Sequence, residues 1–279
     1  MRGKRPHIAL LLSGLPRQWR HCLPSQLDLL KEYSVDVFFH FWDTIDAKEK
    51  TEIVDLLKPQ AYRFEPPQDF LYMDTDPSIK PDLINVPSRM ISQYYSWRAA
   101  ASLVEPFKSE YDVGMRSWAD LQFVYSLDHI IPKLKSDELV TTWWEKNSTF
   151  SDLFAVGGIE PILYFHALYD HVRDYAPALE FNSEILLTTH LKKRSDITVY
   201  AETTQFFFVR RPHMDNYTVE QAMLENPGRN KWLDPELVQA HALYHQKGEE
   251  SAVYFKEFQR AQLHKLVDEV REKTKNDKP

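Results

Sequence analysis

The stretch HIALLLSGLP, residues 7–16, decides the fold class of this chain. Its apolar run His7–Leu12 is continuous rather than alternating, which is typical of a strand covered on both faces of a sheet. The run stops at the turn sequence Ser13-Gly14-Leu15-Pro16. A strand buried on both faces needs helices on either side of its sheet, so the segment predicts an α/β protein.

Strand and helix patterns alternate along the rest of the chain. The order β-α-β-α-β predicts a mixed, mostly parallel sheet with helices on both faces. Strands are expected at residues 35–42, 61–64, 111–115, 154–156, 197–200 and 205–209, and helices at 24–33, 51–57, 88–107, 161–173, 183–193 and 235–273. Residues 66–87 carry five prolines and are expected to form a long surface loop.

Composition and charge narrow the class of protein. Hydrophobic residues make up 43% of the 279 residues and charged residues 27%, as in ordinary globular proteins. A net charge of -7 argues against nonspecific nucleic-acid binding, which needs a surplus of Lys and Arg. Cys22 is the single cysteine, so no disulfide forms within the chain, and a reducing, cytoplasmic location is expected.

No membrane segment is expected either. The apolar run Ile8–Leu12 is shorter than the roughly 7–15 residues of a signal-peptide core. No stretch approaches the roughly 18 apolar residues of a membrane span. Contact with membrane-bound material is therefore expected only at a membrane surface.

The residues that directly follow the strands are the first candidates for a binding site, because ligands of open α/β sheets bind at the carboxyl ends of the strands. Gly14 lets a ligand approach the backbone, and the forked guanidinium of Arg17 suits a diphosphate. A plain turn with a surface arginine is the alternative. The candidates are Ser13, Gly14 and Arg17 after the first strand, His40, Trp42 and Asp43 after the second, and Arg116, Ser117, Trp118 and Asp120 after the fourth.

The segment YDVGMRSWADLQF, residues 111–123, is the most informative one. A strand runs into a turn with Arg116 and Asp120, after which Leu121 and Phe123 return to the core. An aspartate held there can bind Mg²⁺ or Mn²⁺, and the metal can neutralise a diphosphate leaving group. The alternative is that Asp120 caps the turn or pairs with Arg116.

Two further acids are candidate general bases. Asp152 is expected directly before the strand LFAVGG, and Glu184 opens the helix SEILLTTHL, with Ser183 or Asn182 as its N-cap. Either carboxylate can deprotonate an acceptor hydroxyl. Compensation of the helix dipole is the alternative for an acid at a helix start.

Several well-known motifs are absent from the sequence. It contains no GxGxxG and no GxxxxGK[ST], so Rossmann dinucleotide binding and P-loop chemistry are unsupported. It also lacks GxSxG and HExxH, which argues against a serine hydrolase and a zincin. The acidic pair in Asp74-Thr75-Asp76 is expected to be a loop feature rather than a metal site.

Four segments together resemble a GT-A-type nucleotide-sugar glycosyltransferase-like family of bacterial polysaccharide clusters and large viruses. They are IALLLSGLPRQW with the later DVFFHFWD, SQYYSWRAAASLV, YDVGMRSWADLQF, and SDLFAVGG followed by NSEILLTTHL, and they span roughly residues 7–195. The resemblance implies a GT-A-like, Rossmann-like fold, a nucleotide-diphosphate sugar as donor and a divalent metal, Mn²⁺ or Mg²⁺.

The resemblance also assigns roles to single residues. It implies nucleotide contacts for Ser13, Gly14 and Arg17, and a place near the donor pocket for Gln93 and Trp97. Contacts with the diphosphate and the metal are implied for Arg116 and Asp120. Asp152 and Glu184 are implied to face the sugar and the acceptor. The family's turn reads R-x-R-x-D. Trp118 stands here at the second basic position, which departs from that pattern and leaves the donor's identity open.

The resemblance therefore implies a hexosyl- or pentosyltransferase that moves a sugar to a hydroxyl of a glycan or lipid-linked glycan. Residues 1–214 are expected to form the catalytic domain, and residues 215–279 a helical extension packed on it. A non-catalytic module that binds glycan or nucleotide is the main alternative. An α/β enzyme of sugar-phosphate metabolism is the third.

Overall fold

A computed structural model describes residues 5–81, 86–123, 127–128, 130–144, 149–202 and 206–208 of the chain. The chain divides into two compact units, Met1–Phe206 and Phe207–Pro279. The first unit contains the sheet and every candidate site residue. The expected extension at 215–279, with its helix at 235–273, lies outside the described residues, so this division of the chain stays a prediction.

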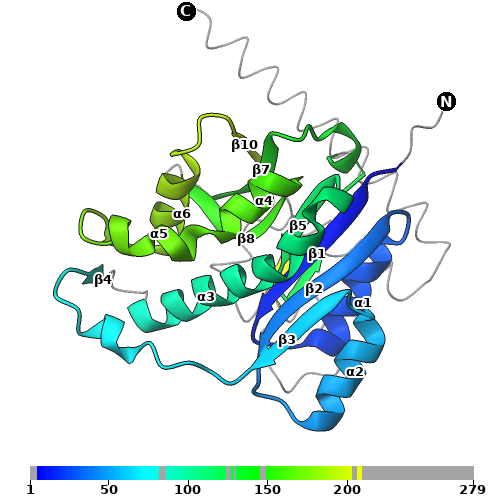
Figure 1. Ribbon diagram of the computed structural model, residues 1–279, viewed down its shortest axis with the longest axis horizontal. Helices are drawn as coiled ribbons and strands as arrows, with labels where there is room; N and C mark the ends of the chain where they lie inside the picture. Colours follow the sequence, from blue (N-terminus) through cyan, green and yellow to red (C-terminus); the bar gives the residue numbers. More distant parts are fainter. Residues whose placement is uncertain are drawn as a thin grey trace, which may run out of the picture. The chain divides into compact units, whose positions relative to one another are not determined.

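A mixed seven-stranded sheet with the order β10-β7-β8-β5-β1-β2-β3 forms the centre of the first unit (Figure 1). The chain enters it at β1 (His7–Gly14), which is parallel to both of its neighbours, β2 (Ser34–Trp42) and β5 (Val113–Ser117). The other strands are β3 (Ala61–Glu65), β7 (Glu138–Trp144), β8 (Thr149–Gly158) and β10 (Thr198–Glu202). Strand β8 runs antiparallel to β5 and β7. The predicted mixed, mostly parallel sheet is confirmed.

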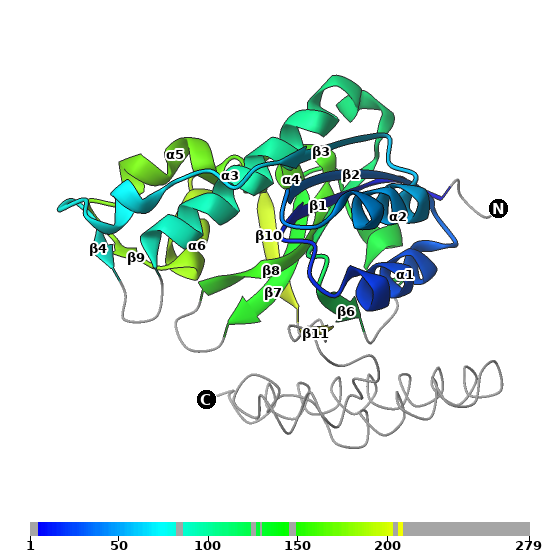
Figure 2. The same cartoon turned by 90° about the horizontal axis from the view of Figure 1, so that it is seen from below.

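Helices cover both faces of this sheet, as predicted for a GT-A-like, Rossmann-like arrangement (Figures 1 and 2). On one face lie α1 (Trp19–Leu30) and α2 (Ala47–Leu57). On the other lie α3 (Pro87–Val104), α4 (Ile159–His166), α5 (Leu168–Tyr175) and α6 (Ser183–Leu191). Shorter elements are η1 (Leu71–Asp74), β4 (Lys80–Pro81), η2 (Glu105–Glu110), β6 (Leu121–Phe123), η3 (Ile131–Lys133), β9 (Glu180–Phe181) and β11 (Phe206–Phe208).

Alternate residues of the apolar run in β1 serve the two faces. Ile8, Leu10 and Leu12 lie in the core beneath α1 and α2, whereas Ala9 and Leu11 lie in the core beneath α3 to α6. All five are fully buried. A continuous apolar strand is therefore required here, because both faces of the sheet are dry.

Some element boundaries differ from the sequence expectation. The helix expected at 24–33 begins earlier, because Gln18 adopts a left-handed conformation that starts α1 at Trp19, and Pro24 lies inside it. The helix expected at 161–173 is divided at Ala167 into α4 and α5. The expected loop at 66–87 contains η1 and β4. Strand β7 was not predicted.

Asp152 also lies elsewhere than predicted. The strand expected at 154–156 begins at Thr149, so Asp152 is inside β8 rather than before it. Because β8 is antiparallel to β5, the beginning of β8 lies at the edge of the sheet where β5 ends.

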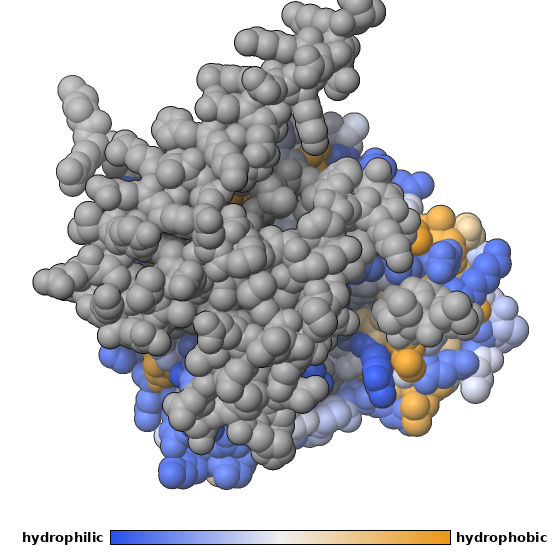
Figure 3. Space-filling view, turned by 180° about the vertical axis from the view of Figure 1, so that it is seen from behind, coloured by the Kyte–Doolittle hydropathy of each residue, from blue (hydrophilic) through white to orange (hydrophobic). Residues whose placement is uncertain are grey.

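The described surface is mixed in polarity. Where described residues are visible on the face shown in Figure 3, hydrophilic residues surround smaller hydrophobic patches. None of the helices in the described ranges combines the length and apolar character needed to cross a bilayer.

Candidate functional site

The turns after β1 and β5 lie side by side at one edge of the sheet. The two strands are parallel neighbours, with Leu12 paired to Ser117, so both turns emerge at the same edge. Gly14 has φ +99°, and a Cβ at this position would lie 3.2 Å from Cζ3 of Trp118. The Gly14 turn therefore meets the turn that carries Trp118 and Asp120.

Helix α1 fixes the second of these turns. Nε2 of Gln26, a fully buried side chain, donates to the carbonyl oxygens of Trp118 (2.8 Å) and Leu121 (2.7 Å). Asp120, between these two residues, is 3% exposed. The sequence signal for Gln26 is a polar residue within the buried stripe of α1, which otherwise carries Trp19, Cys22, Leu23 and Leu30.

Arg116 is the central residue of the site. It pairs in register with Leu11 and points toward the helices α3 and α4. Its guanidinium carbon lies 4.3 Å from the centroid of the Trp97 ring, 4.9 Å from that of Trp118 and 5.5 Å from that of Phe165. The side chain is fully buried, and Nε, Nη1 and Nη2 have no hydrogen-bond partner among the described residues.

Burial and charge act in opposite directions on Arg116. Burial lowers the pKa of its guanidinium to about 9, while the charges of Asp152 and Asp120 oppose this shift. The group therefore stays a cation at neutral pH. A buried cation that no described group hydrogen-bonds is costly, and the charges of Asp152 and Asp120 offset only part of this cost.

Asp152 is held by two donors from different helices. Its Oδ2 accepts hydrogen bonds from Nε2 of Gln93 in α3 (2.6 Å) and from Oγ of Ser183 at the start of α6 (2.6 Å). The aspartate is 7% exposed. Its orientation is therefore fixed by the packing of α3 and α6 against β8.

Glu184 lies close to the same group of residues. The Oδ1 atom of Asn182 caps α6 by accepting from the N–H groups of Glu184 (3.0 Å) and Ile185 (3.1 Å). Burial raises the pKa of Tyr94 well above its usual value, and the charges of Asp152 and Glu184 act in the same direction. Glu184 is half-buried.

Most of the predicted site residues thus come together around Arg116. The residues in this group are Gly14, Gln93, Trp97, Arg116, Trp118, Asp120 and Asp152. Ser13 is fully buried at the end of β1, beside its register partner His40. Arg17, in contrast, is exposed in the turn before α1, and none of the described contacts joins it to Arg116 or Asp152.

A polar group that the sequence analysis missed supports the Gly14 turn. The Gly14 N–H donates to Oγ of Ser96 in α3 (2.7 Å), and this oxygen is also 2.8 Å from Nδ1 of His40. Ser96 gave no sequence signal, because a serine within a helical pattern has no motif around it. His40 stood among the residues after the second strand, without an assigned role.

The divalent metal that the family resemblance implies, with Asp120 as its ligand, stays a prediction. Within the described residues, no three His, Cys, Asp or Glu side chains gather closely enough to hold a metal ion. The charge that acts on Asp120 and Asp152 together is that of Arg116. At phosphate sites Mg²⁺ is usually held by one or two carboxylates together with substrate phosphates and water, and a guanidinium competes for the same carboxylate oxygens.

The acidic pair Asp74 and Asp76 serves the local backbone. Asp74 accepts hydrogen bonds from the N–H (2.8 Å) and Oγ (2.8 Å) of Ser88, in the first turn of α3. Asp76 accepts from the N–H (2.9 Å) and Oγ (2.7 Å) of Ser78. The expectation that this pair is a loop feature fits these contacts.

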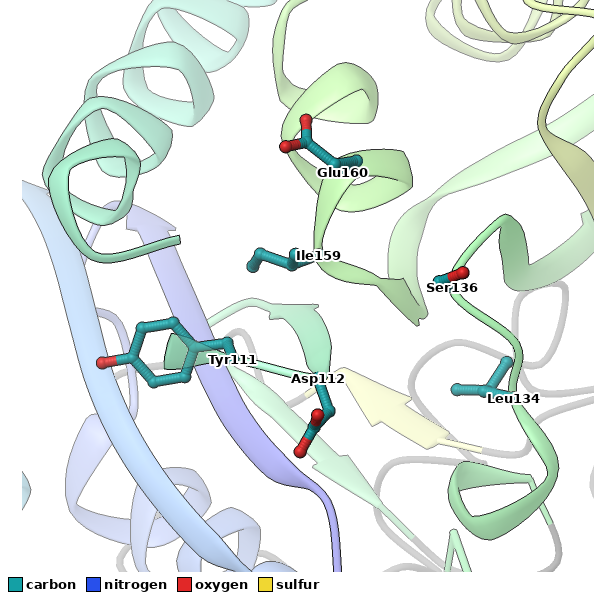
Figure 4. A pocket seen from close by; sticks show the side chains of 6 residues that line it. All are labelled: Tyr111, Asp112, Leu134, Ser136, Ile159 and Glu160. Carbon is teal, nitrogen blue, oxygen red and sulfur yellow. The ribbon is translucent and has the colours of Figure 1, made fainter. Parts of the chain in front are cut away.

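A separate hollow of about 360 Å³ lies at the opposite edge of the sheet, where β5 begins and β8 ends (Figure 4). Its carboxylates are already engaged: Asp112 accepts from the His7 N–H at 2.9 Å, and Glu160 pairs with Lys108 at 2.6 Å. The hollow is lined by Tyr111, Asp112, Leu134, Ser136, Ile159 and Glu160. It does not belong to the cluster around Arg116.

No family model matches the chain, and no curated protein matches it. Among solved structures, the chain is similar to mouse xyloside xylosyltransferase 1 in its apo form, with 12% identity, a TM-score of 0.40, and coverage of 70% of this chain and 84% of that one. The galactosyltransferase LgtC, in complex with donor and acceptor sugar analogs, gives 11% identity, a TM-score of 0.43 and coverage of 69% and 72%.

A glycosyltransferase involved in the glycosylation of the major capsid of PBCV-1 gives 11% identity, a TM-score of 0.42 and coverage of 79% and 89%. Several solved structures that resemble the chain are thus glycosyltransferases. Similarity at this level carries no residue roles to the present chain.

Proposed function

We propose that this protein is a glycosyltransferase that takes a sugar from a nucleotide-diphosphate donor and transfers it to a hydroxyl of a glycan or lipid-linked glycan. The observation that carries the proposal is the buried guanidinium of Arg116, which has no hydrogen-bond partner among the described residues. It lies at the carboxyl edge of the sheet, next to the Gly14 turn, where open α/β sheets bind ligands.

A diphosphate suits this environment for two reasons. Its negative charge offsets the cost of a cation held out of water, and its oxygens accept from the forked N–H groups of an arginine. The backbone at Gly14 adds room for close approach, since this residue carries no side chain. Aromatic rings from Trp97 and Trp118 flank the guanidinium and limit its movement.

Asp152 is the proposed general base. The acceptor hydroxyl oxygen attacks the anomeric carbon, and its proton passes to the Asp152 carboxylate. The bond between the anomeric carbon and the diphosphate oxygen breaks, and the diphosphate leaves with the bonding electrons and faces Arg116. Gln93 and Ser183 fix the orientation of the base from one side. Glu184 is the alternative base, since it lies in the first turn of α6 beside the same group.

Asp120 remains the candidate ligand of a divalent metal, and no step is assigned to that metal. The positive charge that faces the departing diphosphate comes from Arg116 in this proposal. Ser13 and Arg17 remain proposed nucleotide contacts. The cytoplasmic location, and contact with a membrane surface at most, belong to the same proposal.

A thermal-shift titration with UDP, GDP and ADP tests donor binding directly. A ligand that binds the folded protein raises its melting temperature in proportion to RT ln(1 + [L]/Kd), so one of these nucleotides should stabilise the protein. If none does at millimolar concentration, the donor site is refuted. Release of the nucleoside diphosphate from the matching nucleotide sugar then tests turnover.

A non-catalytic binding module is the second candidate function. Trp118, at the position of the second basic residue in the resembled turn, favours it, because a single arginine then faces the diphosphate. The two functions differ in turnover. A protein that binds nucleotide sugar but neither hydrolyses nor transfers it, with every glycan acceptor tried, is a binding module.

A further inference from the structure

A chain of hydrogen bonds joins the Gly14 turn to the outer strand of the sheet. The Gly14 N–H donates to Oγ of Ser96 (2.7 Å), Oγ of Ser96 lies 2.8 Å from Nδ1 of His40, and Nε2 of His40 lies 3.0 Å from Oε2 of Glu65. These residues come from β1, α3, β2 and β3 respectively. Ser96 and His40 are both fully buried.

The donors and acceptors in this chain follow from its two ends. A backbone N–H can only donate, so Ser96 Oγ accepts from Gly14. An ionised Glu65 carboxylate can only accept, so Nε2 of His40 carries the proton. The neutral imidazole then presents a bare Nδ1, which accepts the Ser96 hydroxyl proton. Every group in the chain is satisfied by this single arrangement.

The surroundings of His40 favour that neutral form. Burial lowers the pKa of His40, hydrogen bonding and charge from Glu65 oppose this effect, and the charge of Arg63 adds to it. Tyr95 of α3 faces the same imidazole, with ring centroids 5.9 Å apart. The titratable and charged groups that face His40 in the described structure are therefore Glu65, Arg63 and Tyr95.

Serine, histidine and glutamate also form the triads of hydrolases, but this group is not one of them. The Ser96 oxygen already accepts from the Gly14 N–H and lies 2.8 Å from Nδ1 of His40, so it is not free to attack a substrate carbon. What the group does contact is the turn that packs on Trp118. Its effect is on the position of that turn.

We propose that Ser96 is a positioning residue of the donor site. Its hydroxyl oxygen accepts from the Gly14 N–H, and the His40–Glu65 pair orients the Ser96 hydroxyl so that a lone pair of this oxygen faces that N–H. The part of this inference that concerns the donor rests on the proposed function. The part that concerns the hold on Gly14 does not, because it is a property of the ligand-free protein.

Protonation of His40 makes a specific difference. When Nδ1 gains a proton it donates to Ser96 Oγ, and the Ser96 hydroxyl then turns to the other described acceptor, the His40 carbonyl oxygen at 3.2 Å. The Gly14 N–H stays hydrogen-bonded to Ser96 Oγ whether His40 is neutral or protonated, but the polarisation of that oxygen differs between the two states. The Gly14 amide signal should therefore report the titration of His40.

Gly14 can be observed selectively by NMR. The chain has seven glycines, and Gly14 is the one that follows a serine. Cell-free labelling of the full chain with ¹⁵N-glycine and carbonyl-¹³C-serine therefore selects its amide. In the ligand-free wild type, the chemical shift of this signal should change with pH as His40 titrates. In ligand-free Ser96→Ala, the signal should have a different chemical shift that does not respond to the titration of His40.

Two variants of His40 separate the proposed hold from a merely structural role. In His40→Asn the side-chain oxygen replaces Nδ1 and still accepts from Ser96, whereas His40→Gln replaces Nε2 and keeps only the contact with Glu65. Both remove an imidazole from the same buried place, so both should lower stability. Ser96→Ala and His40→Gln should weaken binding of the stabilising nucleoside diphosphate by about two- to tenfold, the effect of one hydrogen bond. His40→Asn should bind as the wild type does.

The outcomes are distinct. Wild-type affinity in Ser96→Ala, or equal losses in His40→Asn and His40→Gln, overturns the positioning role and leaves the proposed function standing. Absence of nucleotide binding in the wild type removes the proposed function and the donor part of the inference together. The Gly14 signal of the ligand-free protein still tests the claim that Ser96 holds the Gly14 turn. If this signal is unchanged in Ser96→Ala, that claim is wrong.

Discussion

The guanidinium carbon of Arg116 lies 4.3 Å from the centroid of the Trp97 ring, and no described residue forms a hydrogen bond with that guanidinium. A cation–π contact recovers only part of the lost hydration of a cation, about 2 kcal/mol when the pair is desolvated. The arginine is therefore held at a cost to stability, which points to a function that uses its charge.

The variant Arg116→Met should show separately what the buried charge costs the stability of the fold and what it contributes to nucleotide binding. The lowered pKa of Arg116 means that its charge is unfavourable in the folded protein despite Asp152 and Asp120, so the ligand-free variant should melt no lower than the wild type. Its stabilisation by nucleoside diphosphate should disappear. Thermal-shift curves with and without nucleotide measure both effects.

Arg98→Met is the matched control for that variant. Arg98 also lies on the α3 side of the molecule, but it forms ion pairs with Glu105 (2.7 Å) and Asp170 (2.8 Å) and is 31% exposed. This control should leave nucleotide binding unchanged. An Arg116→Met protein that melts well below the wild type and still binds nucleotide would contradict our view of the site.

The same arginine should produce a pH dependence at high pH. Its folded-state pKa is about 9, lowered by burial, against an ordinary value of 12.5. Between these values the unfolded chain binds more protons than the folded one, so this group's contribution to the free energy of unfolding rises as the pH increases from about 9. Nucleotide affinity should fall over the same range, because the cation is lost. The difference between wild type and Arg116→Met in chemical unfolding and in Kd isolates this group from other titrations.

Asp152→Asn should abolish turnover while sparing donor binding. The amide oxygen still accepts from Gln93 and Ser183, so the local packing is kept, but the side chain no longer takes a proton. General-base catalysis contributes at least about 100-fold, and a loss of this size in the transfer rate is expected. Nucleotide Kd and rate are measured on the same preparation. If Glu184→Gln shows the loss and Asp152→Asn does not, Glu184 is the base.

Gly14→Ala should destabilise the protein by about 1–3 kcal/mol, the cost of forcing a residue with a side chain into an unfavourable backbone conformation. The backbone there has φ +99°, and the new methyl group would press against the Trp118 ring. Lys58→Gly provides the opposite case. Lys58 ends α2 with φ 43°, where glycine is preferred, so this change should leave stability equal or higher. Urea unfolding compares the two.

Chelation should leave nucleotide binding intact. The positive charge at the proposed diphosphate position belongs to Arg116, and the described side chains provide no cluster of metal ligands. Titration of the protein with nucleoside diphosphate in EDTA and in Mn²⁺ should give the same Kd. A binding curve that requires Mn²⁺ would show that the family's metal dependence holds here after all.

The sheet could be predicted from the sequence because its signal is local. The run Ile8–Leu12 is apolar throughout and Val35–Trp42 is mostly apolar and aromatic, as is typical of strands that are covered on both faces. The meeting of the Gly14 and Asp120 turns also followed, since parallel neighbours end at a common edge. Strand β7 escaped prediction because ELVTTWW combines a charged residue and two threonines with its apolar ones.

The interior of the site could not be predicted in the same way. The burial of Arg116 depends on how α3 and α4 cross the sheet, and its own sequence neighbours do not encode this. The link from Gly14 to Ser96 spans 82 residues, and neither residue carries a signal for the other. Asp152 was recognised as a candidate, but the two donors that orient it come from helices distant in sequence.

The contact between Gly14 and Trp118 limits how this site can be engineered. The indole fills the space that a side chain at position 14 would need, so the two positions share one volume. Restoring a second basic residue in place of the tryptophan would leave a gap beneath the first turn, and enlarging the glycine would expel the ring. A library that aims to change donor preference should therefore vary both positions together, because a single substitution at either position leaves a gap or causes a clash.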